Sequence, residues 1–394
     1  MLKIVAILAT AMATNIYIPV APSILGALVD YQGMTIDVAG RLIAYNFWGA
    51  SVSTVLAVFL VHRKGWDLRR SMFGCLLLVI VTSGASVWEA GNVDALAIIR
   101  FVNGLAAGFG FTVGAVALIG SPQVERWYAI FFGMPFVIGG VGMATLPYVY
   151  HLSGISGAFY GIGAINLLVA FLLPYFPKTI MHEAKKEKAT SLFRDRQLSM
   201  MTGVLLVALF LHYLFNSGIW TYFERLGVAY GMSPETAGLI LGPSMFAAIA
   251  GMIGASVLGN RLGYLRPIYS GTVVIMFSTI MLLFSQSDVA FAVGTALFNA
   301  SITFVTPYFI ALLALLVPSG LGVSTANVAT LLGFSTGPYL LSYLIEDNKF
   351  RPSIILTALG FLIVISLVFW FSRMLRRTEG LQSVKAVCES RGAT

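Results

Sequence analysis

Twelve long apolar runs decide what this chain can fold into. Each run is about as long as the roughly 20 apolar residues that a helix needs to cross the hydrocarbon core of a bilayer. Their approximate limits are 4–28, 36–61, 71–88, 94–119, 127–150, 156–177, 200–223, 234–259, 267–286, 289–316, 320–344 and 352–373. Membrane β-barrels are a poor alternative, because their alternating segments are only about 10 residues long. The sequence therefore predicts an all-α polytopic membrane protein with 12 transmembrane helices.

The composition excludes most soluble functions. Of the 394 residues, 58% are hydrophobic and 10% are charged, whereas a soluble domain carries about 25% charged residues. The net charge of +8 does not indicate a nucleic-acid partner, because the basic residues lie in short loops rather than on one face. Two cysteines exclude a disulfide scaffold. The sequence has neither a P-loop nor an H-E-x-x-H zinc pattern, so we expect no cofactor, no metal and no enzyme activity.

Basic residues are distributed unevenly between the two sides of the membrane. With a cytoplasmic N-terminus, 19 of the 24 Lys and Arg residues fall in cytoplasmic segments, and three fall in outer loops: Arg225, Lys349 and Arg351. Cytoplasmic loops carry such an excess, so both termini are expected inside the cell. The run 4–28 is too long for the apolar core of a signal peptide and is interpreted as the first span. The lean loops favour a cell inner (plasma) membrane, with lipid as a partner.

The longest interior loop divides the chain into two halves of six spans. It contains the basic run Lys185-Lys186-Glu187-Lys188. The predicted domains are an N-terminal six-helix bundle, a cytoplasmic linker, a C-terminal six-helix bundle and a cytoplasmic tail, at 1–177, 178–198, 199–374 and 375–394. The halves echo each other, since Asn103 and Asn299 are 196 positions apart and Gly65 and Gly263 are 198 apart. Two parallel repeats place a binding cavity near the middle of the membrane.

Short motifs give the whole chain a resemblance to the major facilitator superfamily. The fourth span contains Arg100-Phe101-Val102-Asn103-Gly104, which is similar to the family motif R-x-x-q-G. The fifth span keeps part of the antiporter motif as Gly133-Met134-Pro135 and Gly139-Gly140. The resemblance implies two pseudo-symmetric six-helix bundles and a secondary transporter that works by alternating access. It also implies that Arg100 lies by a central cavity and takes part in proton coupling.

The cytoplasmic loops after the second and eighth spans carry the family's gate motif in modified form. His62 and Asn260 stand where the family has an aspartate, which weakens the expected charge pairs. By resemblance, the loop residues cap helix ends and hold one conformation through charge pairs. The predicted cytoplasmic gate consists of Arg63, Gly65, Asp67, Arg69, Arg70, Asn260, Arg261, Gly263 and Arg266.

Polar residues recur at helical spacing on six predicted spans. His212, Asn216 and Trp220 on the seventh span follow each other at intervals of four residues. Such stripes can serve only to hold helices together, but their recurrence predicts a shared aqueous cavity. The predicted cavity residues are Asn15, Tyr17, Tyr45, Arg100, Asn103, His212, Asn216, Trp220, Asn299, Thr303, Tyr308 and Asn327.

Ionisable groups within membrane spans are few, and each is a candidate for function because a charge there is costly. The coupling candidates are Asp37, Arg41, His212 and Glu224. Each has a plainer interpretation. Asp37 and Arg41 suit an interfacial ion pair, His212 suits a packing role, and Glu224 with Arg225 suits an outer gate pair or a solvated loop.

The excess of arginine over carboxylate in the spans predicts a small organic anion as substrate, because a desolvated guanidinium requires an anionic partner. Protons are the expected driving ion, and the protein is expected to act as a monomer. The alternative within transport is a drug/proton antiporter that exports apolar or cationic compounds. A distant alternative is an intramembrane enzyme or a sensor.

Overall fold

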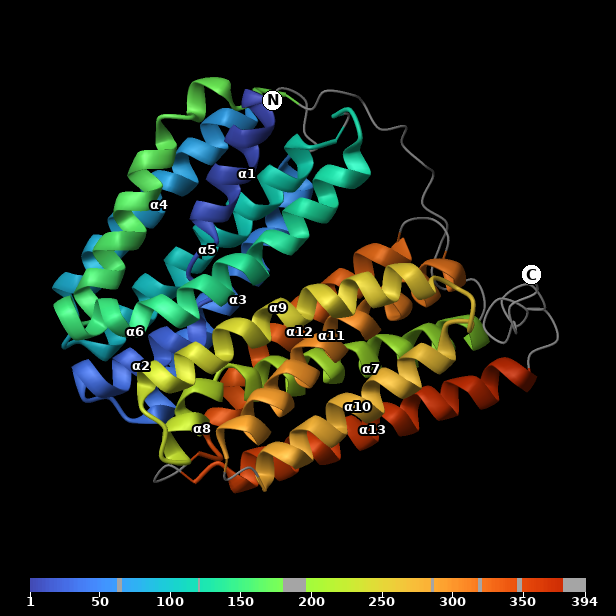
Figure 1. Ribbon diagram of the computed structural model, residues 1–394. Coiled ribbons are helices and arrows are strands. Elements are labelled where there is room, and N and C mark those ends of the chain that lie inside the picture. The colour runs from blue at the N-terminus through green and yellow to red at the C-terminus, as the bar shows by residue number, and fades with distance from the viewer. Residues whose placement is uncertain are drawn as a thin grey trace. The chain divides into compact units, whose positions relative to one another are not determined.

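The computed structural model describes residues 1–61, 66–119, 121–179, 196–284, 287–317, 321–345 and 349–377. Its elements in these ranges are helices, with no β-strand among them (Figure 1). They are α1 (Leu2–Thr14), α2 (Ala21–Gln32), α3 (Ile36–Val61), α4 (Leu68–Trp88), α5 (Val93–Ala117), α6 (Val124–Ala170), the 3-10 turn η1 (Leu173–Tyr175), α7 (Arg196–Trp220), α8 (Phe223–Ala229), α9 (Pro234–Leu258), α10 (Leu265–Leu283), α11 (Asp288–Leu316), α12 (Leu321–Ser342) and α13 (Arg351–Arg377).

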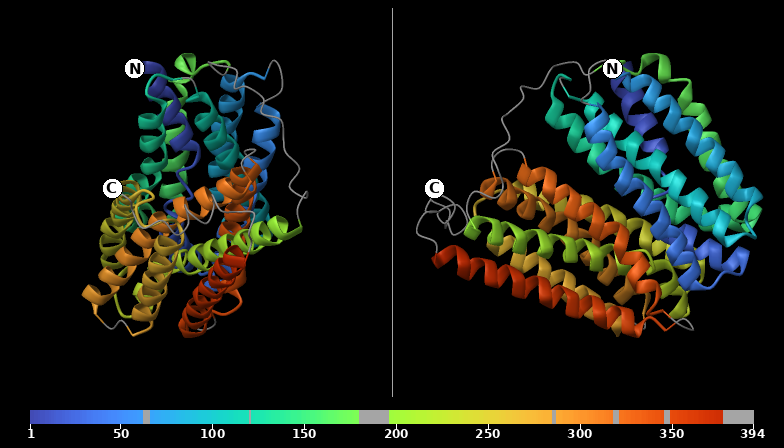
Figure 2. Two further views of the ribbon diagram at one scale, coloured as in Figure 1. Left: turned by 90° about the vertical axis from the view of Figure 1, so that its right-hand side faces the viewer. Right: turned by 180° about the vertical axis from the view of Figure 1, so that it is seen from behind.

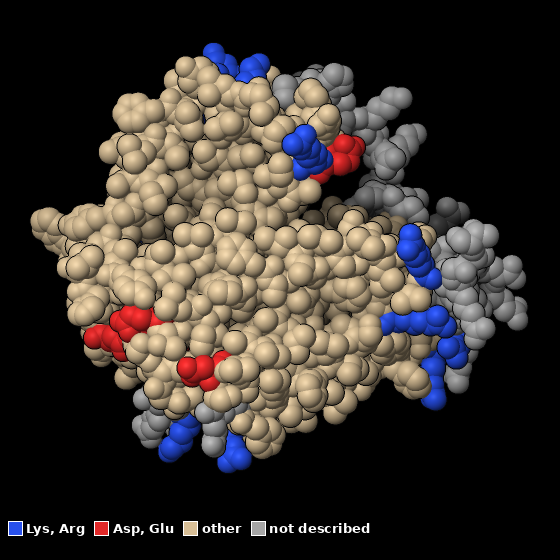
Figure 3. Space-filling model, in the orientation of Figure 1, with Lys and Arg blue, Asp and Glu red and all other residues tan. Residues whose placement is uncertain are grey.

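The prediction of an all-helical, multi-pass membrane protein is confirmed. Within the described ranges, eight helices are long and apolar enough to cross a membrane: α4, α5, α6, α7, α9, α10, α11 and α13. Long helices also occupy the second and eleventh predicted spans, as α3 with 26 residues and α12 with 22. On the face drawn in Figure 3, uncharged residues cover a wide area and charged side chains lie at its margins.

Three predicted spans differ in detail from the helices found. The first span is interrupted between Thr14 and Ala21, so that it forms the two short helices α1 and α2. Spans five and six, predicted as 127–150 and 156–177, form two helical segments of α6 that meet at a kink without an intervening loop. The bend between them is at Gly154, whose φ of 61° and ψ of −170° are readily adopted only by glycine. No longer loop is needed there, because one flexible residue changes the direction of the chain.

The chain forms two compact units. Unit 1 consists of Met1–Ala184 and Thr221–Gly242, and unit 2 consists of Lys185–Trp220 and Pro243–Thr394. The segment Thr221–Gly242, which contains α8 and the start of α9, therefore packs in unit 1 although its neighbours in sequence belong to unit 2. The domain boundaries drawn from the sequence remain a prediction.

In unit 1, α5 runs along α3 and α4 at close range (Figure 1). A Cβ atom at Gly104 of α5 would collide with the carbonyl oxygen of Asn46 on α3, and one at Gly108 would collide with the carbonyl of Ala50. Small residues allow membrane helices to approach this closely. The glycines thereby bring the polar side chains of α3 and α5 within reach of each other.

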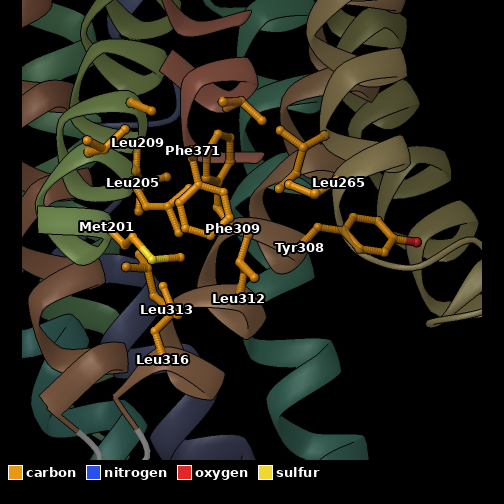
Figure 4. Close-up of a cluster of buried hydrophobic side chains, with 14 of the residues drawn as sticks. Met201, Leu205, Leu209, Leu265, Tyr308, Phe309, Leu312, Leu313, Leu316 and Phe371 are labelled. Carbon is orange, nitrogen blue, oxygen red and sulfur yellow. The ribbon is translucent and has the colours of Figure 1, made fainter. Parts of the chain in front are cut away.

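In unit 2, α7 packs between α12 and α13, and α10 packs against α11 and α13 (Figure 2). Met201, Leu205 and Leu209 of α7 point towards Phe309 of α11 and Phe371 of α13 in the buried core (Figure 4). Gly333 and Gly337 of α12 face the backbone of α7, where a Cβ would collide with the carbonyls of Phe210 and Leu214.

Candidate functional site

Arg100 on α5 is buried inside unit 1, with 2% of its surface exposed. Its Nη2 atom donates to the carbonyl oxygen of Thr82 at 3.3 Å and to Oγ of Ser86, both on α4. The guanidinium carbon lies 4.8 Å from the ring centres of both Tyr17 and Phe159. Such cation–π contacts stabilise a cation that has lost its water.

No carboxylate within the described ranges pairs with Arg100, whose Nε atom lacks a hydrogen-bond partner. A buried charge normally requires an ionic partner or a complete set of hydrogen bonds. Arg100 has an incomplete set of hydrogen-bond acceptors around its guanidinium, and neutral groups alone stabilise its charge in the described structure.

Three helices share a polar network next to Arg100. Asn46 of α3 donates through Nδ2 to the carbonyl of Arg100 at 3.1 Å and to Oδ1 of Asn103 at 2.9 Å. Asn103 in turn donates to Oγ1 of Thr82 at 2.8 Å. Of the predicted cavity residues, Tyr17, Arg100 and Asn103 are thus brought together in unit 1.

Thr82, Ser86, Asn46 and Phe159 complete this site, but none was among the predicted cavity residues. Thr82 and Ser86 lie four residues apart in an otherwise apolar span, so a helical polar stripe was visible in the sequence. Phe159 gave no signal, because the chain has 28 phenylalanines and nothing marks one of them as a ring beside a cation.

Unit 2 repeats the asparagine network without the cation. Asn299 of α11 donates to Oγ of Ser244 on α9 at 3.2 Å, and the hydroxyl of Thr303 donates to the carbonyl of Ala248 at 2.6 Å. The position equivalent to Arg100, at the spacing of 196 that relates Asn103 to Asn299, is Ala296. The positive charge is therefore a property of the first repeat alone.

His212 on α7 is fully buried among aromatic rings of unit 2. Its ring centre lies 5.7 Å from those of Phe309 and Phe361, and neither ring nitrogen has a hydrogen-bond partner. Asn216, one turn further on, is buried too, and its Nδ2 atom lacks a partner. In the described structure the imidazole is therefore held by ring packing alone.

The remaining predicted cavity residues have varied surroundings. Trp220 is buried, with its ring centre 6.3 Å from that of Phe334, and the hydroxyl of Tyr308 donates to the carbonyl of Ala255. Asn15 and Tyr45 are half-buried, whereas Asn327 is exposed. The polar stripe of α11 therefore joins helices within unit 2, through the bonds of Asn299 and Thr303 to α9.

Two of the coupling candidates form an ion pair on α3. Arg41 Nη1 lies 3.0 Å from Asp37 Oδ2, and both side chains are about one-third exposed. Arg41 is therefore compensated, in contrast to Arg100. Of Arg41 and Arg100, only Arg100 lacks an ion-pair partner in the described structure.

The last coupling candidate, Glu224 on α8, is buried and bonded to its neighbour in sequence. Arg225 donates to both carboxylate oxygens of Glu224 at 2.6 Å and to both oxygens of Asp30 on α2 at 2.7 Å. Of the two interpretations drawn from the sequence, the paired arrangement is found and the solvated loop is not. This cluster lies wholly within unit 1.

The predicted cytoplasmic gate is only partly covered by the structure. Asp67 caps α4 by accepting a hydrogen bond from the backbone N–H of Arg70 at 3.0 Å, and Arg69 Nε donates to the carbonyl of Phe176 at 2.7 Å. Arg63 and Gly65 lie outside the described residues. In the second repeat Asn260, Arg261 and Arg266 are exposed, and Gly263 has a φ of 69°, which favours glycine.

The apolar helices and their glycine-mediated packing within two compact units define a polytopic helical membrane protein. A family model described as Major Facilitator Superfamily matches residues 4–318 and 205–387. The chain belongs to the major facilitator superfamily, and it is accordingly a transporter rather than an enzyme. No curated protein sequence matches it closely enough to count as a relative.

Solved structures of transporters share its fold at low sequence identity. The nucleoside transporter NupG superimposes with a TM-score of 0.72 and 11% identity, covering 96% of this chain and 100% of that one. A D-xylose-proton symporter gives a TM-score of 0.71 and 15% identity, covering 94% and 96%. An auto-inhibited POT family peptide transporter gives 0.72 and 10%, covering 96% and 97%. At these identities the likeness concerns the fold alone.

Proposed function

We propose that this protein is a secondary transporter of a small organic anion, which it moves by alternating access in an inner membrane. The observation that carries the proposal is the uncompensated charge of Arg100. A guanidinium presents a fork of donors that suits a carboxylate, and this one has no carboxylate partner within the described structure.

The interruption between α1 and α2 supports access of an anion to Arg100. Tyr17, whose ring covers the guanidinium, lies in this non-helical segment rather than in a rigid helix. The segment also ends at the N-terminus of α2, the positive end of a helix dipole. Discontinuous helices of this kind hold substrates in other transporters. A shift of Tyr17 would open the guanidinium to a carboxylate.

The solved neighbours transport a nucleoside, D-xylose or peptides according to their titles, so they do not choose among substrate classes. The charge of the Arg100 site is what distinguishes between substrate classes in this proposal. Arg100 disfavours a cationic solute, because two unpaired positive charges would then share a desolvated site. Proton coupling, both termini in the cytoplasm and a monomeric state complete the proposal.

Counterflow in proteoliposomes tests this proposal. Vesicles are loaded with one unlabelled solute and then given a trace of the same labelled solute, with small carboxylates, aromatic carboxylates and lipophilic cationic dyes compared at two pH values. We expect transient accumulation of at least one carboxylate and none of the dyes. Accumulation of the dyes with no carboxylate exchange would contradict the anion proposal and favour the drug/proton antiporter.

A further inference from the structure

The segment Thr221–Gly242 makes a small group of specific contacts with α2 and α6, the neighbouring helices of unit 1. The Arg225 guanidinium makes a two-pronged contact with Asp30 of α2, with both nitrogen–oxygen distances at 2.7 Å. A Cβ at Gly26 of α2 would collide with the Glu224 carboxylate, and one at Gly238 of α9 would collide with the carbonyl of Met143 on α6. The segment thus packs tightly on α2 and α6.

A space of about 10 Å³ lies beside the Glu224 carboxylate, among residues of α2, α6, α8 and α9. Ser23, Asp30, Tyr150 and Glu235 contribute its polar walls. This volume is about the smallest that can hold one water molecule. The hydroxyl of Tyr150 receives a hydrogen bond from Ser23 at 3.5 Å. A polar space next to a carboxylate offers a position for a proton-carrying water.

The charges around Glu224 do not balance. Within the described ranges, Arg225 is the one cation bonded to Glu224 and Asp30, so these three groups carry one negative charge in excess when both acids are ionised. Glu235 lines the same space, and its carboxylate interacts electrostatically with His151. Tyr31 lies beyond the predicted first span. Partial burial raises the pKa of the Tyr31 hydroxyl, and the negative charges of Asp30 and Glu235 raise it further.

We propose that the Glu224 carboxylate is a proton-binding site, and that proton uptake there stabilises the packing of Thr221–Gly242 on unit 1. One proton removes the excess charge and leaves the bond between Arg225 and Asp30 intact. Glu224 is the acceptor because its side chain is 3% exposed, whereas that of Asp30 is 36% exposed and stays hydrated. Desolvation disfavours the charged form of a carboxyl group.

The direction of the pH effect follows from linkage. Glu224 binds a proton more tightly when the segment is packed and the carboxyl is desolvated than when the segment is detached and hydrated. Acid therefore favours the packed segment, and this stabilisation is lost as the pH rises through the range in which packed Glu224 gives up its proton. The proposal rests on the proposed function only in naming this proton as the coupling ion.

Hydrogen exchange of the full chain in lipid nanodiscs, without any substrate, tests the site. Protection of peptides within Thr221–Gly242 is compared at about pH 5.5 and about pH 8, after correction for the intrinsic rate. We expect up to about tenfold greater protection at the lower pH in the wild type, as for a change of one pKa unit. Peptides of α4 should show no such difference.

Three variants separate the roles of the acids. Glu224→Gln, or Glu224→Met if the glutamine variant does not fold, should give high protection at both pH values. Asp30→Asn should lower protection at both, because the bond to α2 is lost. Glu235→Gln removes a neighbouring negative charge without touching the contact with Arg225, so it should keep the pH dependence but move it to lower pH.

A wild-type segment whose corrected protection is the same at both pH values would overturn the assignment. So would a full pH difference in Glu224→Gln, or a shift of the pH dependence to higher pH in Glu235→Gln. Because exchange is measured without substrate, failure of carboxylate counterflow would contradict the proposed function and leave this site standing. Conversely, the proton-site proposal alone would be contradicted if carboxylate counterflow occurs but the protection of Thr221–Gly242 does not depend on pH.

Discussion

Two buried polar side chains, Arg100 and His212, have different relations to their surroundings. Arg100 has two hydrogen bonds and two aromatic rings around its charge. His212 has rings alone, and both of its nitrogens lack partners. An unsatisfied buried group costs about 1–3 kcal/mol. The hydrogen bonds and rings around Arg100 therefore offset part of the free energy lost by burying its charge. His212 has no hydrogen bond to offset its burial, so it lowers the free energy of unfolding.

Replacement of His212 by leucine should accordingly stabilise the protein by about 1–3 kcal/mol, because an apolar side chain of similar size leaves no unsatisfied nitrogen. Thermal unfolding of the purified protein in detergent measures this as a rise in melting temperature. The exposed His151→Gln serves as control and should leave the midpoint unchanged. Loss of pH-dependent transport in His212→Leu would contradict the account, since it would make His212 the coupling group.

At the scale of helices, glycine decides how closely α3 and α5 approach. We expect Gly104→Ala to destabilise the protein by about 1–3 kcal/mol, the usual cost of overpacking a tight contact. The matched control is Gly74→Ala on α4, where a Cβ has open space and which should be neutral or stabilising by up to about 1 kcal/mol. Melting temperatures of the two variants compare them directly, and equal effects would show that the close approach is not needed.

Hydropathy was sufficient to find most helices in the sequence, because every residue of a span experiences the same apolar solvent. It could not find the contacts between helices. The partnership of Arg100 with Thr82 and Ser86 depends on which faces of α4 and α5 meet, and the joining of spans five and six depends on one backbone angle at Gly154. The bonding of Arg225 to Asp30, 195 positions away in sequence, left no local trace either.

At the scale of the whole chain, the two repeats keep a common scaffold and differ in charge. Each has a buried asparagine that is bonded to the neighbouring helix, Asn103 to Asn46 and Asn299 to Ser244. The first repeat adds Arg100, and the second has Ala296 at the matching position. The proposed preference for anions therefore rests on the first repeat alone.

The most direct test of this account is carboxylate counterflow by Arg100→Gln in proteoliposomes, with the exposed Arg126→Gln as the matched control. Loss of one charge-assisted bond of about 1.5–3 kcal/mol should lower exchange roughly tenfold to a hundredfold, and Arg100→Lys should recover part of it. Arg126→Gln should exchange at the wild-type rate. Carboxylate exchange at the wild-type rate by a folded Arg100→Gln variant would contradict the central claim.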